Sequence, residues 1–148
     1  MSEEFLENID LEEFDIPVFI DQEKEIEITI WVGASKKSPD FIYCDFDFDK
    51  FKEVSGEDLK NFKEYKLWFR YPSFNDNNVL LSNSLKYSVS NELELSPTKL
   101  SFDRICMLIK RWTFPKECNT DNLKGLSPIV GLVVGMALDN ELKKLGLL

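Results

Sequence analysis

The sequence predicts a single α+β domain in which an N-terminal antiparallel β-sheet precedes a C-terminal helical section with two main helices. Apolar and polar side chains alternate with a period of two in several stretches before residue 95. Helical spacing takes over from residue 96, and Ser-Pro pairs stand where the two main helices should begin. A length of 148 residues fits one hydrophobic core. We therefore expect one domain over 16–148, with the sheet at about 16–95 and the helices at about 96–146.

The segment before this domain, residues 1–15, is predicted to be an acidic N-terminal arm. Residues 1–27 hold eleven acidic side chains and one cation, Lys24, so they carry a formal charge of −10 and leave +1 for residues 28–148. The acidic start lacks the cationic region and apolar run of a secretory signal. The arm is a solvated leader, an amphipathic helix docked on the body, or a segment that folds on a partner. Its apolar side chains include Phe5, Leu6, Ile9 and Phe14.

Two strands are predicted in the first third of the domain. Residues 25–32 and 42–48 each alternate between apolar and polar side chains, which is typical of half-buried strands. Because a loop containing Gly, Ser and Pro joins the two runs, we expect an antiparallel pair. The apolar side chains are Ile26, Ile28, Ile30 and Val32 in the first run and Ile42, Cys44, Phe46 and Phe48 in the second.

A third strand is predicted over 65–71, after a short helix that Ser55 can cap. Pro72 has no N–H to donate, so the strand should end there or lie at an edge of the sheet. The Asn-rich run at 75–78 is expected to form a turn. Residues 79–95 leave strand and helix open, although apolar positions alternate again from Leu85.

The first main helix is predicted to begin at Ser96 and to end before Pro115. Its apolar residues recur at helical spacing, at Phe102, Ile105, Cys106, Ile109 and Trp112. Thr120 can cap a short turn that ends at Gly125.

The last helix is predicted to begin at Ser127 and Pro128 and to run to about Lys144. Its apolar stretch before Asp139 has thirteen residues, fewer than the about 20 that a membrane span needs, so we expect a buried helix and no membrane contact. Glycines at 131 and 135 would let another element approach this helix closely.

No combination of residues in the chain indicates catalysis or a cofactor. The chain has no histidine and no Cys-x-x-Cys pair, which together exclude the common zinc sites. The missing histidine also excludes a nucleophile–histidine pair. The six glycines form no phosphate-binding loop. We therefore expect no catalytic residue, no cofactor and no enzymatic activity. The three cysteines are widely spaced, which favours free thiols in a reducing compartment: Cys44, Cys106 and Cys118.

The run of acidic residues at 45–49 invites a calcium interpretation. Its aspartates have the spacing of the first three ligands of a calcium loop. However, Lys50 and Gly56 occupy the positions where that loop requires glycine and glutamate. We expect no metal site.

One stretch, 64–74, combines aromatic and cationic side chains. Such a pattern can stack on single-stranded nucleic acid, but the body has too little clustered positive charge for that function. An exposed Trp between two cations on an edge strand instead favours a contact with another protein, since Trp and Arg concentrate binding energy at interfaces. The predicted partner-binding residues are Lys66, Trp68, Arg70 and Phe74.

The order of motifs from residue 65 onward resembles that of the tail assembly chaperones of tailed bacteriophages. These motifs are "WFRYPSFND", "LIKRWTFP", "TDNLKGLSP" and "IVGLVVGMALDNEL", and together they span roughly the last 85 residues. The residues that match the shared pattern are Arg70, Pro72, Ser73, Asp76, Trp112, Asn122, Leu126 and Pro128. Physically they are expected to determine the fold, with an Arg70–Asp76 ion pair at the Pro-Ser bend.

The resemblance implies a non-enzymatic assembly factor in the host cytoplasm. It would bind a viral tail or tape-measure protein during virion morphogenesis and would not remain in the finished particle. A homo-oligomer through the glycine face of the last helix or the strand edge near Pro72 is an open alternative to a monomer.

Two other functions stay open. The chain can be an acidic inhibitor that mimics DNA and blocks a host nuclease, with Asp45, Asp47 and Asp49 beside the arm as one acidic ridge. It can also be a structural tail or baseplate component, which would be found in purified particles.

Overall fold

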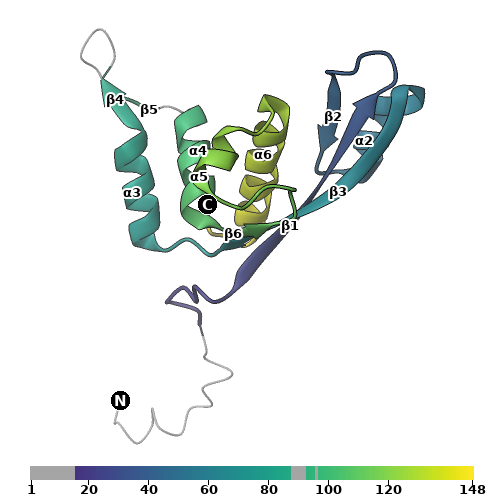
Figure 1. Ribbon diagram of the computed structural model, residues 1–148. Coiled ribbons are helices and arrows are strands. Elements are labelled where there is room, and N and C mark those ends of the chain that lie inside the picture. The colour runs from purple at the N-terminus through teal and green to yellow at the C-terminus, as the bar shows by residue number, and fades with distance from the viewer. Residues whose placement is uncertain (1–15, 88–92, 96) are drawn as a thin grey trace, which may run out of the picture.

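The computed structural model describes residues 16–87, 93–95 and 97–148, so the predicted arm at 1–15 and the predicted helix start at Ser96 lie outside the described residues. A four-stranded antiparallel sheet has the strand order β2-β1-β3-β6 (Figure 1). Its strands are β1 (Glu25–Ser35), β2 (Ile42–Asp45), β3 (Leu59–Arg70) and β6 (Ile109–Trp112). A separate two-stranded sheet pairs β4 (Leu85–Tyr87) with β5 (Leu93–Leu95).

Helices are interleaved with the strands and are not gathered after them. The first part of the chain contains α2 (Phe48–Ser55), the 3-10 turn η1 (Gly56–Asp58) and α3 (Phe74–Ser84). The second part contains α4 (Pro97–Leu108), α5 (Thr120–Lys124) and α6 (Pro128–Lys144), with β6 between α4 and α5. The predicted α+β class is confirmed, whereas the predicted order of a sheet followed by helices is wrong.

The strand β6 shows why helical spacing misled the prediction for the first main helix. Ile109 and Trp112 are three residues apart, a spacing that fits one face of a helix. In the structure they pair with Phe69 and Leu67 of β3, and a register shift adds Lys110 as an extra residue. This bulge places two residues three apart on the same face of a strand. The helix α4 ends at Leu108. Ile109 and Trp112 then reach the core from the sheet instead of from a helix.

The main core lies between the sheet and two helices, α4 and α6 (Figure 1). The alternation predicted for 25–32 is confirmed for Ile26, Ile28 and Ile30, which are buried on the inner face of β1. The register places Ile26 opposite Phe69 and Ile28 opposite Leu67, so the two strands present one apolar surface. Burial of each such side chain stabilises the fold by about 1.5–3 kcal/mol relative to exposure.

The helices α4 and α6 approach each other closely at Gly135. The sequence predicted a close approach at two glycines, Gly131 and Gly135. A Cβ atom at Gly135 would collide with the hydroxyl of Ser101 on α4, so a larger residue there would require that side chain to move. A Cβ at Gly131 would meet open space, so the prediction of a close approach at that residue is wrong. Arg104 of α4 also donates to Asp139 of α6 at 2.9 Å.

The opposite, outer face of the sheet is covered at one end by α2. Phe51 of this helix is 1% exposed and packs edge-to-face on Phe62 of β3, with ring centroids 5.6 Å apart. A Cβ at Gly33 of β1 would collide with Phe51, which explains the glycine in the middle of a strand.

The prediction of a strand over 42–48 is wrong at its end because Asp47 caps α2. The side chain of Asp47 accepts hydrogen bonds from the backbone N–H groups of Asp49 and Lys50, at 3.0 and 3.2 Å. These bonds satisfy donors that a helix start leaves without partners. β2 consequently stops at Asp45.

The short helix predicted after Ser55 is confirmed only as the three-residue 3-10 turn η1, and the Ser55 side chain makes no cap hydrogen bond to it. Ser55 ends α2, and its hydroxyl donates to the carbonyl oxygen of Phe51. The chain then leaves the helix at Gly56, whose φ of 51° suits glycine. After η1, residues 59–64 continue directly into β3 because they pair with β1.

The predicted turn at 75–78 is instead the first part of α3. Ser73 and Asp76 form a reciprocal cap: the Ser73 hydroxyl accepts from the Asp76 N–H, and the Asp76 carboxylate accepts from the Ser73 N–H. Such a pair stabilises a helix start in a sequence that otherwise favours turns. The Asn-rich composition was therefore a weaker signal than the cap.

Candidate protein-binding groove

The residues predicted to bind a partner lie on β3 and at the start of α3. Lys66, Trp68 and Arg70 occupy the outer face of β3, while Phe74 begins α3 and is 84% exposed. β3 lies between β1 and β6 in the sheet, so the prediction of an edge strand at Trp68 is wrong. Their role as a partner-binding set stays a prediction.

These three β3 side chains already have contacts within the chain. The Nζ atom of Lys66 lies 3.6 Å from a carboxylate oxygen of Glu27. The guanidinium of Arg111 lies 4.5 Å from the centroid of the Trp68 ring and donates to Glu25 at 2.6 Å. The side chains on the outer face near Trp68 therefore already have partners within the chain, through ion pairs and a cation–π contact.

Arg70 forms the ion pair that the sequence predicted at the Pro-Ser bend. Its guanidinium donates to both oxygens of Asp76, at 2.6 and 3.1 Å. This contact, with additional hydrogen bonds from Ser73, lowers the pKa of Asp76 to about 2. Arg70 braces the connection between β3 and α3, as a fold determinant would.

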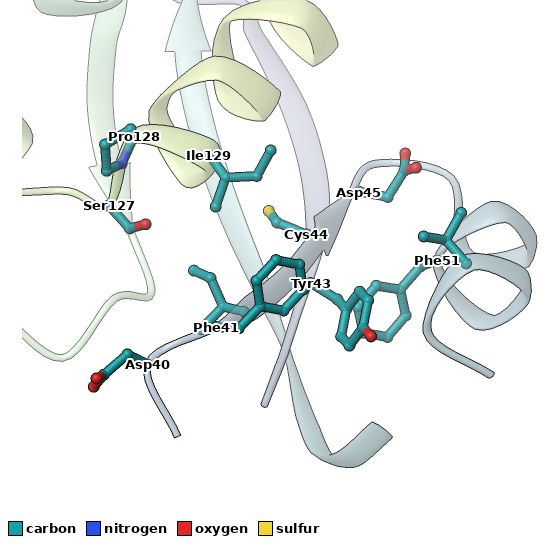
Figure 2. Close-up of a pocket in the computed structure, with 11 residues that line it drawn as sticks. Asp40, Phe41, Tyr43, Cys44, Asp45, Phe51, Ser127, Pro128 and Ile129 are labelled. Carbon is teal, nitrogen blue, oxygen red and sulfur yellow. The ribbon is translucent and has the colours of Figure 1, made fainter. Parts of the chain in front are cut away.

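A groove of about 460 Å³ lies elsewhere, along the outer edge strand β2 (Figure 2). Its lining comes from three separate parts of the chain: 40–45, α2, and the start of α6. Figure 2 shows Ser127, Pro128 and Ile129 on one side of β2 and Phe51 on the other. The lining residues are Asp40, Phe41, Ile42, Tyr43, Cys44, Asp45, Phe51, Val54, Ser127, Pro128 and Ile129.

The two walls of the groove belong to opposite faces of the sheet. Tyr43 pairs with Gly33 and so points to the outer face, where α2 supplies Phe51 and Val54. Cys44 pairs with Val32 and so points to the inner face, where α6 supplies Ile129. A groove lined from both faces must run along the edge of β2. The strand edge therefore lies between two apolar walls.

The loop before β2 is held by Asp58 of η1. The Asp58 carboxylate accepts from the hydroxyl of Ser35 at 2.6 Å, from the hydroxyl of Tyr43 at 2.8 Å and from the Lys37 N–H at 3.2 Å. The hydrogen bond from Ser35 and then that from Tyr43 lower the pKa of Asp58, while the same bond raises the pKa of Tyr43. The network fixes the direction of β2 relative to α2.

The groove continues into an apolar face of α6 that the described residues leave exposed. Ile129, Leu132 and Met136 are 37%, 60% and 50% exposed, and their spacing places them on one side of the helix. The prediction that this helix is buried is therefore wrong for one of its faces. A surface helix normally has polar residues on its outer side, so an apolar stripe there indicates a contact surface.

Among the residues that line the groove, the charged ones are Asp40, just before β2, and Asp45, the last residue of β2. Within the described part of the chain, neither carboxylate takes part in an ion pair. Burial, and secondarily the charge of Asp45, raises the pKa of the Cys44 thiol to about 12. Cys44 is consequently a neutral, apolar part of the wall and not a reactive thiolate.

Sequence reasoning missed this groove because its parts are far apart along the chain. A local signal existed for the wall that α6 supplies. Apolar residues occur on all sides of the helix over 126–138, and a single core can cover only one side. The other wall had no such signal, because Val54 and Phe51 come from a helix that the sequence did not predict.

Over the described ranges, no three acidic or cysteine side chains gather closely enough to hold a metal ion. No helix in those ranges is both long and apolar enough to cross a membrane. Comparisons with protein-family models, with curated proteins and with solved structures found no match to this chain.

Proposed function

We propose that this protein is a non-enzymatic assembly chaperone that binds a phage tail or tape-measure protein during virion morphogenesis. The observation that carries the proposal is the exposed apolar face of α6, whose first residue, Ile129, also lines the groove beside β2. Such a surface suits a client whose own apolar segments are exposed before assembly. The motif order described above supports the choice of a tail protein as the client.

The charge distribution supports the same function. A chaperone that presents an apolar surface needs net charge elsewhere to stay soluble. The formal charge of the chain is −9, and residues 1–27 supply the excess of negative charge. The complex with an aggregation-prone client would share this solubility until the client is assembled. The host cytoplasm is the compartment in which that assembly takes place.

Neither alternative function has a specific observation in its favour. A DNA mimic needs carboxylates that face outward as an array. Asp47 instead caps α2, and Asp58 accepts hydrogen bonds from Ser35 and Tyr43. A structural tail component would require no transient client surface.

The proposal is tested by co-expressing the protein with a candidate phage tail or tape-measure protein and measuring the soluble fraction of that client. We expect the wild-type chain to raise the soluble fraction and to co-purify with the client. The double variant Leu132→Glu/Met136→Glu should lose this effect because it places two charges in the apolar face of α6. The matched control, Asn140→Glu, adds a charge at an exposed position of the same helix.

Two results would contradict the proposal. One is a double variant that solubilises the client as well as the control does. The other is recovery of the protein in purified virions in stoichiometric amounts, which would favour a structural component. Capture of a host nuclease in place of the tail protein would favour the inhibitor.

A further inference from the structure

We propose that the edge of β2 accepts an added β-strand from the partner, an extended segment with alternating apolar side chains and basic residues at its ends. This inference deepens the proposed function and rests on it for the identity of the partner as an assembling protein. The added strand would continue the sheet beyond β2. It would lie along the groove between α2 and α6.

The backbone of β2 offers the hydrogen-bonding groups that an added strand needs. The N–H of Ser35 donates to the carbonyl of Phe41 at 3.3 Å, so these two residues form a hydrogen-bonded pair across β1 and β2. Such pairs alternate along antiparallel strands, so Tyr43 also directs its N–H and C=O toward β1. Ile42 and Cys44, between them, direct theirs outward into the groove. Two donors and two acceptors are thus available at this edge.

The walls of the groove match the two faces of an added strand. Successive side chains of a strand point to opposite faces. One set would therefore contact Val54 of α2, and the other set would contact Ile129 of α6. Val54 is 71% exposed, so it has a large apolar area for such a contact to cover. Alternating apolar residues in the partner segment would pack against one wall, and small β-branched residues such as Thr would fit against the other.

The charges at the groove favour a basic partner. Asp40 precedes β2 and Asp45 ends it, and the described residues give neither of them an ion pair, so cations at the two ends of an added strand would complement them. The acidic residues 1–15 of this chain have the opposite character and would be repelled. A second copy that paired β2 with β2 in antiparallel fashion would bring Asp45 close to Asp40 of the other copy. Like charges so placed across strands destabilise the pairing.

β2 is short, but it lacks the other features that usually prevent strand addition. Natural edge strands carry lysine, proline or a bulge that discourages pairing with another chain. The four residues of β2 include no lysine or proline, and their register with β1 has no shift. The stretch of β3 that extends beyond its pairing with β6 has Lys60 and Lys63. Among the edges of the four-stranded sheet, β2 is the one suited to a partner.

The test uses the full-length protein and a labelled acetylated heptapeptide amide, KVTVTVK, with binding measured by fluorescence anisotropy. Two N-methylated versions carry the methyl groups on alternate amide nitrogens, so one set faces β2 and the other faces solvent. We expect one set to weaken binding at least about tenfold, equivalent to about 1.4 kcal/mol, and the other to change it little. Side-chain contacts alone would not distinguish the two sets.

Variants locate the site and test the charges. Ile129→Lys should weaken peptide binding about tenfold, because it places a cation in the α6 wall facing a cationic peptide. Asn140→Lys, on the same helix and outside the groove, should bind as the wild type does. The peptide EVTVTVE should bind more weakly than KVTVTVK, and the double variant Asp40→Asn/Asp45→Asn should reduce that difference. Circular dichroism confirms that each variant is folded.

Several outcomes would overturn the inference. They are no binding of KVTVTVK, equal losses with the two N-methylated sets, unchanged binding by Ile129→Lys, or a dimer in sedimentation that Ile129→Lys dissociates. If the client is solubilised but the peptide fails these tests, strand addition is wrong and the proposed function stands. If the peptide passes and the client is not solubilised, the groove is a strand-binding site with a different partner.

Discussion

The two edge strands of the sheet, β2 and β6, differ in charge, in the regularity of their pairing and in their surroundings. β6 carries Lys110 and Arg111, and a bulge interrupts its register with β3. The Arg111 guanidinium stacks on Trp68 and is paired with Glu25, so the cations of this edge are held in place. β2 has no cation and a regular register, and its edge lies between two apolar walls.

The difference indicates which edge is available to a partner. Cations, bulges and short length discourage the pairing of an edge strand with another chain, and β6 has all three. β2 is equally short, but a groove guides an incoming segment toward its backbone. The aromatic and cationic pattern around Trp68 belongs to the β6 side, where it stabilises the fold. The proposed contact surface is therefore the one around Ile129.

The largest effect is expected from Phe51→Ala, which removes the side chain that anchors α2 as a wall of the β2 groove. Phe51 is almost fully buried, so the substitution should lower the free energy of unfolding by about 3–5 kcal/mol. Urea unfolding monitored by circular dichroism measures the change. Val54→Ala, at an exposed position of the same helix, should cost less than about 0.5 kcal/mol. Equal losses would show that α2 is not anchored through Phe51.

A smaller effect is expected from Asp76→Asn, at the braced end of β3. Loss of the charge-assisted hydrogen bonds from Arg70 should lower the free energy of unfolding at pH 7 by about 1–3 kcal/mol. Asp121→Asn, at an exposed position in the first turn of α5, should have little effect and serves as the control.

The contribution of Asp76 should also depend on pH, with a sign that follows from its pKa. The folded-state pKa of about 2 lies below the ordinary value of 3.8, so the stabilisation is complete above about pH 4. It is lost as the pH falls toward 2. The wild type and Asp76→Asn should therefore converge in urea midpoint between pH 4 and pH 2. A constant difference across that range would contradict the assigned ion pair.

The smallest effect is expected from Glu25→Gln, which releases the cations of β6. Arg111 and Glu25 are both partly exposed, and solvent-exposed ion pairs contribute about 0–1 kcal/mol. We expect a loss within that range that shrinks further in 1 M salt, measured by urea unfolding beside Glu23→Gln. A loss well above that range would mean that β6 is held to the sheet chiefly by this ion pair and not by its core contacts.

The sequence predicted the features that depend on neighbouring residues. The alternation of Ile26, Ile28 and Ile30, the start of α6 at Pro128 and the Arg70–Asp76 pair are all visible locally, and the structure confirms them. The position of a strand within the sheet cannot be predicted from neighbouring residues, because it depends on which strands pair in the fold. Pro72 predicted that β3 would end there or lie at an edge. The strand does end, at Arg70, but β6 pairs beside it at Leu67 to Phe69, so β3 is not an edge strand.

The remaining errors have one physical cause, which is competition between patterns of similar strength. The bulge at Lys110 allows apolar residues three apart to serve a strand, and the cap at Asp47 converts an alternating run into a helix start. The candidate groove was beyond local reasoning altogether. It exists because Asp58 fixes the β2 segment between α2 and the start of α6, three parts of the chain that only the fold brings together.

Residue-resolved hydrogen exchange of the client complex is the most direct test of the account. It compares the backbone amides of Ile42 and Cys44 in β2 with those of Lys110 and Arg111 in β6, in the protein alone and in its complex with the tape-measure protein. We predict that client binding slows exchange at Ile42 and Cys44 and leaves β6 unchanged. Slowed exchange at β6, or none at either edge, would contradict the assignment of β2 as the strand that receives the partner.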